Sequence, residues 1–350
     1  MRRIIIGCLA LTAVLLLAAP VRSPSPALPP ALGIAVNLEP SASAAARQAA
    51  LDAVRRTGAS FFAFELSWSA AEPHPGDYRV GDVTRAARVM RQSGATLHLD
   101  LPLVTENARD VPADLAVTAF DDPKLSLRLG RLLDALTPAL PDFQTLSLGT
   151  EADSYFASKP EQLPAYRRLF DGTVQFLRKK APRLLVGVTT VAPTESRSPE
   201  IAGALHQRSP ALFYIYAPFV RGTPFAERAP DSLEEDWTAL VKGAAGRPIA
   251  FPVVSYSSSA VNGSSPEKQA EFIRRFRRFL AKADGRALLF ARYVSLRDAA
   301  PDAIPSIPGE VSATEIRRRA FLANRGLQNA AGEPKPGWRE WVKEATGVKR

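Results

Sequence analysis

The chain has 350 residues, enough for one large α/β domain, and its 46% hydrophobic content is ordinary for a folded protein with a substantial core. Its only cysteine, Cys8, lies in the first apolar stretch, and its three histidines are scattered, so we expect no disulfide, metal or cofactor chemistry. The formal net charge of +10 is suited to an anionic partner.

The N-terminal residues have the layout of an export signal. Two arginines precede an apolar run from Ile4 to Ala19. We expect residues 1–22 to be a signal peptide, or an uncleaved anchor because the run approaches the length of a membrane span. Residues 23–31 read as a proline-rich linker, and 32–350 as a single domain. The protein is therefore expected to be exported, periplasmic or extracellular, which argues against nucleic acid as a partner.

From residue 33 onward, short apolar runs alternate with longer amphipathic segments. Near-continuous apolar runs are typical of parallel strands buried on both faces. Eight such units predict a (β/α)₈ TIM barrel, with a doubly wound open sheet as the alternative. No glycine-rich phosphate loop follows the first run, which favours the barrel. The expected strands cover residues 33–38, 60–66, 95–101, 143–149, 183–191, 211–219, 247–256 and 286–296, and the helices between them include 43–58, 80–94, 123–140 and 160–182.

Polar side chains follow the ends of several expected strands, where barrel enzymes place their catalytic groups. Carboxylates and aromatic rings at this end, without a phosphate loop, are suited to sugar chemistry, because rings stack on sugar faces and paired carboxylates carry out glycoside hydrolysis. We therefore expect an oligo- or polysaccharide as partner. The candidates are Glu65, Trp68, Asp100, Glu151, Asp153, Tyr216, Tyr256 and Asp298.

Each candidate also has a purely structural interpretation. Glu151 and Asp153 could be held by the dipole or the cap of a helix that starts there. Glu65 and Asp100 could pair with an arginine inside the barrel. The aromatic candidates could be plain core packing.

Four segments resemble motifs of the clan A (β/α)₈ glycoside hydrolases, a superfamily of retaining glycosidases. WSAAEPHPGDY (68–78) is similar to their Trp-x-x-x-Glu-Pro-x-x-Gly-x-Tyr loop after strand two, and LSLGTEADSY (146–155) to their strand-four Gly-Asn-Glu motif. PIAFPVVSYSSSAVNGSSPEKQAEF (248–272) resembles the strand-seven segment, and RGLQNAAGEPKPGWREW (325–341) the C-terminal tail. The resemblance extends over most of residues 33–342.

The resemblance implies roles for individual residues. Glu151 falls on the general acid/base, which needs a raised pKa. Thr150 stands where the family has an asparagine that binds the sugar, and Val253 stands where the family has its nucleophilic glutamate. No carboxylate occurs between Arg247 and Pro266, so the retaining mechanism is not expected in its usual form.

Three functions remain open at this point, and the sequence leaves it uncertain whether the protein is an enzyme. The first is a glycosidase with relocated chemistry, in which Asp100, Glu65 or Asp298 acts as a base roughly 6.5–9.5 Å from Glu151. The second is a non-catalytic barrel that binds carbohydrate, with Trp68, Thr150, Asp153, Tyr216 and Tyr256 as binding residues. The third is a scaffold that contacts a partner or an anionic envelope surface through basic helices, notably Arg274, Arg275, Arg277 and Arg278.

Overall fold

The computed structural model describes residues 29–38, 42–304 and 312–347. The expected signal or anchor, and most of the expected linker, lie outside these residues. Among the described residues, no helix is both long enough and apolar enough to cross a bilayer.

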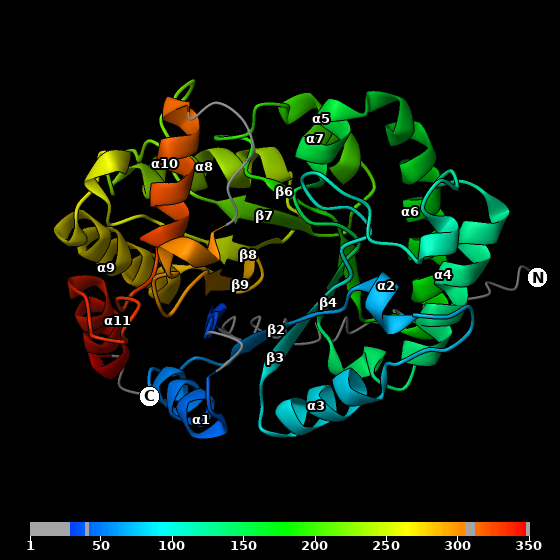
Figure 1. Ribbon diagram of the computed structural model, residues 1–350, viewed down its shortest axis with the longest axis horizontal. Helices are drawn as coiled ribbons and strands as arrows, with labels where there is room; N and C mark the ends of the chain where they lie inside the picture. The colour runs from blue at the N-terminus through cyan, green and yellow to red at the C-terminus, as the bar shows by residue number, and fades with distance from the viewer. Residues whose placement is uncertain (1–28, 39–41, 305–311, 348–350) are drawn as a thin grey trace, which may run out of the picture.

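In the described part of the chain, nine short strands lie at the centre and helices surround them (Figure 1). The strands are β1 (Ala31–Ile34), β2 (Phe61–Glu65), β3 (Thr96–Asp100), β4 (Thr145–Ser147), β5 (Leu185–Gly187), β6 (Thr189–Val191), β7 (Leu212–Tyr216), β8 (Ile249–Val254) and β9 (Leu288–Tyr293). The helices are α1 (Ala44–Arg55), α2 (Trp68–Ala71), α3 (Gly81–Gln92), α4 (Pro123–Leu136), α5 (Ala152–Ser158), α6 (Leu163–Lys180), α7 (Pro199–His206), α8 (Ser232–Ala244), α9 (Pro266–Lys282), α10 (Ala313–Ala323) and α11 (Pro336–Gly347).

The strands run parallel in the order expected of a (β/α)₈ barrel. One sheet has the order β1-β9-β8-β7-β6 and the other β2-β3-β4-β5. Strands β5 and β6 are two pieces of the single strand expected over 183–191, and they join the sheets at one seam because β5 pairs with β4 and β6 with β7. At the other seam, Ser60 N donates to the carbonyl oxygen of Leu32 at 2.9 Å. The predicted TIM barrel is confirmed.

The first strand lies slightly earlier than the sequence predicts. Strand β1 begins at Ala31, inside the expected linker, and ends at Ile34 rather than at residue 38. Leu32 and Ile34 face the helical layer and carry the apolar packing of this strand. The more polar residues from Asn37 onward lie beyond the last strand pairing with Tyr293.

Side chains pack in layers on both faces of the strands. Inside the barrel, Phe61, Phe213, Ala250 and Phe290 form one cluster, and the ring of His98 lies against three of these aromatic rings. Two larger clusters fill the space between strands and helices. Burial on both faces explains why the strands read as continuous apolar runs rather than alternating ones.

Short polar side chains begin several of the helices where the sequence predicts a start. Ser43 Oγ accepts a hydrogen bond from Ala46 N, and Asp122 Oδ1 accepts one from Lys124 N at 2.7 Å. Ser265 Oγ caps α9 in the same way. These caps satisfy amide groups that the first turn of a helix leaves without an intrahelical partner.

Replacing Gly33 by alanine should destabilise the seam between β1 and β2. A Cβ at this position would lie 2.6 Å from the carbonyl oxygen of Phe61 and 2.9 Å from its Cδ1 atom. We expect the free energy of unfolding to fall by about 1–3 kcal/mol in urea titrations, the range typical of overpacking. Gly130→Ala, in α4 with no atom within 4 Å of the new Cβ, is the matched control and should not destabilise. Equal effects of the two substitutions would contradict this account of the seam.

Candidate functional site

Two of the candidate carboxylates lie side by side at the C-terminal ends of neighbouring strands. Glu65 ends β2 and is in register with Asp100, which ends β3 and is itself in register with Ser147 of β4. Residues in register on parallel neighbours point to the same side of the sheet. The fold therefore brings Glu65 and Asp100 to the same rim that Glu151 reaches after β4.

Glu151 occupies an unusual backbone position between β4 and α5. It precedes the helix as its N-cap residue with φ 52° and ψ 36°, the left-handed region that non-glycine residues rarely adopt. Its carboxylate is half-buried and forms no hydrogen bond or ion pair within the described part of the chain. Burial raises the pKa of Glu151 to about 7, helped by the charges of Glu106 and Asp153 and opposed by Arg325. Strain of this kind concentrates at functional sites.

Asp100 is linked to this position through Thr150. Thr150 Oγ1 donates to Asp100 Oδ2 at 2.7 Å, while Thr150 N donates to the carbonyl oxygen of Val104. Asp100 Oδ1 is buried without a partner among the described residues. Burial raises the pKa of Asp100 to about 6, opposed by the Thr150 hydrogen bond and assisted by the negative charge of Glu65. The structure thus places Asp100 beside the residue that precedes Glu151.

Val253, which the motif resemblance aligns with a nucleophile, has an apolar side chain. Val253 is half-buried in β8 and in register with Ile215 of β7. Arg292 of β9 contacts the residue before it, because its Nε donates to the carbonyl oxygen of Pro252 at 2.8 Å. This part of β8 therefore has a cation bound to its backbone.

A further carboxyl group, Glu227, is buried in the loop after β7. Its Oε1 accepts a hydrogen bond from Ser257 N at 2.6 Å, and the side chain is 8% exposed. Its Oε2 is buried without a hydrogen-bond partner among the described residues, and burial raises the pKa of Glu227 well above its usual range. Burial, assisted by the charge of Glu227, raises the pKa of both Tyr256 and Tyr293, two residues of the core between the strands and the helices.

Asp153 is buried and hydrogen-bonded within the protein. It is 2% exposed, and its two oxygens accept hydrogen bonds from Val191 N at 3.0 Å and from Ser196 Oγ at 2.8 Å. These bonds fix α5 to the end of β6. The expected binding role of Asp153 is replaced by one of positioning the segment that starts at Glu151.

The three aromatic candidates are core residues, so the expectation that they stack on a sugar is wrong for this structure. Trp68 is fully buried and its Nε1 donates to Glu72 Oε2 at 2.8 Å. The hydroxyl of Tyr216 donates to Asp236, and that of Tyr256 to the carbonyl oxygen of Arg228. Both tyrosines are at most 1% exposed. These large rings at the ends of barrel strands pack in the core, which is the structural alternative given in the sequence analysis.

Two further candidates are engaged elsewhere. Asp298, a possible base, accepts hydrogen bonds from Lys335 Nζ at 2.9 and 3.1 Å and from Gly326 N. On α9, Arg274 and Arg275 both pair with Glu271, and the guanidinium of Arg277 lies over the ring of Trp341. Two of the four arginines of that helix are therefore engaged by a carboxylate of the same helix.

Sequence analysis missed several residues of this rim. Arg292 and Arg325 are half-buried and their charges reach the candidate carboxylates, and Glu106 approaches Glu151 from the loop after β3. Phe219 and Phe225 are half-buried rings with centroids 5.3 Å apart, and Phe225 has a φ of 61°. The available signal for Arg292 was an arginine that interrupts the apolar residues 287–294, because only a functional or paired cation is expected there.

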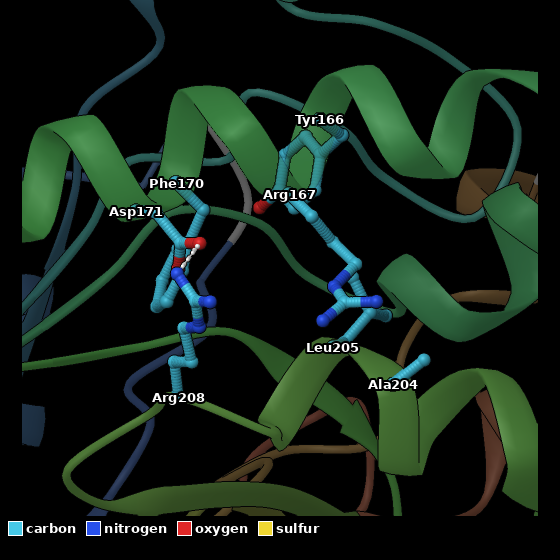
Figure 2. A pocket seen from close by; sticks show the side chains of 7 residues that line it. All are labelled: Tyr166, Arg167, Phe170, Asp171, Ala204, Leu205 and Arg208. Atoms are coloured by element: carbon cyan, nitrogen blue, oxygen red, sulfur yellow. Dashed lines mark hydrogen bonds and ion pairs between the residues drawn. The ribbon is translucent and has the colours of Figure 1, made fainter.

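A small hollow elsewhere on the molecule lies between α6 and α7 (Figure 2). An ion pair between Arg208 and Asp171, 2.7 Å long, crosses it, and Arg167 lies on its other side. None of the candidate site residues lines this hollow. In the residues that the structure describes, no three side chains of the metal-binding types are grouped so that they could hold an ion.

Comparisons with known proteins support the fold. No protein-family model matches the sequence, and no curated protein matches it significantly. GH5_18 from Streptomyces cattleya, in complex with GlcNAc, superposes with a TM-score of 0.66 and 16% identity over 91% of this chain and 80% of its own. An exo-β-1,4-mannosidase from Opitutaceae bacterium strain TAV5 gives 0.65 and 15% over 91% of this chain and 59% of its own. Native xylanase 10B from Thermotoga maritima gives 0.61 and 13% over 90% and 94%.

These likenesses confirm, at the level of the fold, the resemblance to (β/α)₈ glycoside hydrolases that the motifs indicated. With identities of 13–16%, they carry no information on individual site residues.

Proposed function

We propose that this exported protein binds an oligosaccharide at the C-terminal end of its barrel, with Glu151 as the group that donates a proton to the glycosidic oxygen. The observation that carries the proposal is the state of Glu151. It is a half-buried carboxyl in a left-handed backbone position, without a hydrogen bond in the described chain, and its pKa is raised to about 7. A general acid must hold its proton near neutral pH, and burial is the usual means of achieving this.

The side chains around Glu151 favour a single-displacement route over a retaining one. Val253 has no atom that can attack an anomeric carbon, so no glycosyl-enzyme bond forms at that position. In the proposed reaction, Asp100 takes a proton from a water molecule as the water oxygen bonds to the anomeric carbon. The bond from that carbon to the leaving oxygen breaks, and Glu151 supplies the proton to that oxygen. Glu65, in register with Asp100, is the alternative base.

A non-catalytic carbohydrate-binding protein is the second candidate. The observation that favours it is the replacement of a carboxylate by Val253 with the Arg292 guanidinium beside it. Loss of one of two essential groups costs orders of magnitude in rate. In this candidate the same rim binds the sugar and Glu151 serves as a hydrogen-bonding group.

Glu151→Gln tests the first candidate. We expect a loss of at least about 100-fold in the rate of glycan cleavage, because the amide cannot donate the catalytic proton. Wild-type turnover should fall as the pH rises above about 7, when Glu151 loses its proton, and as it falls below about 6, when Asp100 gains one. Reducing-end assays on a broad oligosaccharide panel measure the rate, and NMR of the released anomer should show inversion.

Glu161→Gln removes the same charge at an exposed position nearby and should leave the rate unchanged. Saturable binding without any wild-type turnover would replace the first candidate by the second. Absence of both binding and turnover on the whole panel would contradict the proposed function.

A further inference from the structure

Two arginines flank the candidate site, and the first is Arg292. Its positive charge interacts electrostatically with the carboxylates of Asp100 and Glu65. Its Nε donates a hydrogen bond to the carbonyl oxygen of Pro252, but its two terminal nitrogens donate none within the described residues. The side chain is half-buried, so these donors lie at the edge of solvent.

The second is Arg325, which follows α10. Its positive charge lowers the pKa of Glu151, and its guanidinium lies over the ring of Phe321 at 5.8 Å. Across the described residues it forms no hydrogen bond, and no carboxylate comes within ion-pair distance of it. Burial lowers the pKa of Arg325, which shows that the surrounding protein does not fully solvate its charge.

Several other partly buried cations of this protein are paired directly with carboxylates. Arg128 contacts Glu72 at 2.8 Å, Lys335 contacts Asp298 at 2.9 Å, and Arg228 contacts Asp236 at 2.8 Å. Direct pairing is the normal condition of a partly buried charge, because an unmet one costs free energy. Arg292 and Arg325 have no carboxylate within ion-pair distance among the described residues. They share this condition with Arg109 and Arg247, which donate to backbone carbonyl oxygens, but only Arg292 and Arg325 act on the carboxylates of the candidate site.

A ligand with its own negative charge would supply a direct hydrogen-bonding partner for the guanidinium groups of Arg292 and Arg325. Guanidinium groups bind carboxylate, sulfate and phosphate through paired N–H donors. The valine at position 253 also removes the negative charge that would otherwise repel an anionic sugar from the Arg292 side of the rim.

The carboxylates of the rim oppose such a ligand, and their titration predicts a pH dependence. Glu151 faces Glu106, Asp153 and Arg325, whereas Asp100 faces Glu65, Arg292 and the hydroxyls of Thr150 and Tyr166. Their pKa values of about 7 and about 6 mean that both gain protons as the pH falls from 7.5 to 5.5, while the arginines stay charged. Repulsion of an anion therefore weakens over this interval.

Resting on the proposed function, we infer that the glycan bound at this rim is an acidic oligosaccharide, with a carboxylate or sulfate group held by Arg292 and Arg325. The net charge of +10 assists the approach of such a ligand.

Calorimetric titrations of the full chain with matched hexasaccharides test the inference. The probes are uronate hexasaccharides of several backbones, the carboxyl-reduced neutral form of each, and sulfated hexasaccharides, at pH 5.5 and 7.5. We expect at least one acidic probe to bind about tenfold more tightly than its neutral counterpart, and more tightly at pH 5.5. The uronate and sulfate arms identify which anionic group is recognised.

Arg325→Gln and Arg292→Gln should each weaken binding of the acidic probe about tenfold and weaken binding of its neutral counterpart by a clearly smaller factor. Arg325→Lys should recover part of the loss, since it restores the charge without the guanidinium fork. Arg286→Gln is the charge-matched control, because Arg286 precedes β9 at the opposite end of the barrel, where it pairs with Asp284. Circular dichroism confirms that each variant is folded.

The outcomes separate this inference from the proposed function. Neutral probes that bind as tightly as acidic ones would overturn the inference and leave the proposed function standing. An equal loss in Arg286→Gln would also overturn it, because the attraction would then be due to net charge alone. Absence of binding by any probe would overturn both.

Discussion

Replacing Glu72 by alanine should lower the free energy of unfolding by about 3–5 kcal/mol, because it takes from a buried cation its only fully buried partner. Glu72 is 1% exposed and accepts three hydrogen bonds of 2.8 Å, from Trp68 Nε1, Gly76 N and Arg128 Nε. The Arg128 side chain is 8% exposed and also contacts Asp114 at 2.9 Å. The substitution removes the carboxylate that accepts these three hydrogen bonds, and it leaves the indole N–H of Trp68 without an acceptor as well.

Urea denaturation measures the loss, and Asp77→Ala serves as the control. Asp77 forms a 3.0 Å ion pair with Arg79 in the same segment, but both side chains are largely exposed, so the expected cost is below about 1 kcal/mol. The double substitution Glu72→Leu with Arg128→Met should recover part of the stability, since it removes both charges. If Glu72→Ala cost no more than Asp77→Ala, the network would not hold this loop.

The protein should also lose stability as the pH falls from about 6.5 toward 3, because two of its histidines are buried in the neutral form. Burial lowers the pKa of His98 to about 3, assisted by the charge of Arg292, and burial with the charge of Arg247 does the same for His206. In the unfolded chain both bind a proton below about 6.5. The unfolded state therefore gains protons that the folded state does not, and each histidine costs on the order of 3–5 kcal/mol by pH 3.

Carboxyl groups with raised pKa values act in the opposite direction, so the effect is measured as a difference between proteins. Asp100 and Glu151 bind protons more readily when folded, which stabilises the folded state as the pH falls. His98→Gln and His206→Gln keep a hydrogen-bonding group for Thr145 and Thr190 and do not titrate.

The stability of the wild type relative to each variant should be constant above pH 7 and fall below about 6.5. His74→Gln, at an exposed histidine, is the matched control for the substitution itself. A flat difference for His98→Gln and His206→Gln would show that both residues reach solvent when protonated.

Motif WSAAEPHPGDY shows how a sequence resemblance can be sound while the expected roles of its residues differ. The segment lies where the barrel strands predict it, directly after β2. Its tryptophan and glutamate, however, bind each other and Arg128 inside the protein. Burial of this kind depends on α4, which supplies Arg128 from 56 residues away, and no local pattern indicates it.

The sequence alone determined the order of strands and helices, the barrel and the rim on which Glu65, Asp100 and Glu151 meet. These features follow from local properties, since runs of apolar residues fix the strands and the ends of parallel strands share one edge. The absence of a carboxylate at Val253 is likewise a property of the chain itself.

Tertiary structure alone decided which polar groups at that rim are already satisfied. Asp153, Asp298, Tyr216 and Tyr256 are engaged by partners distant in sequence, whereas Glu151 is not. It also brought Arg292 and Arg325 to the carboxylates, although neither lies near them along the chain. The reason is physical: the cost of burying a charge depends on the groups around it in space, and the barrel assembles these from every strand.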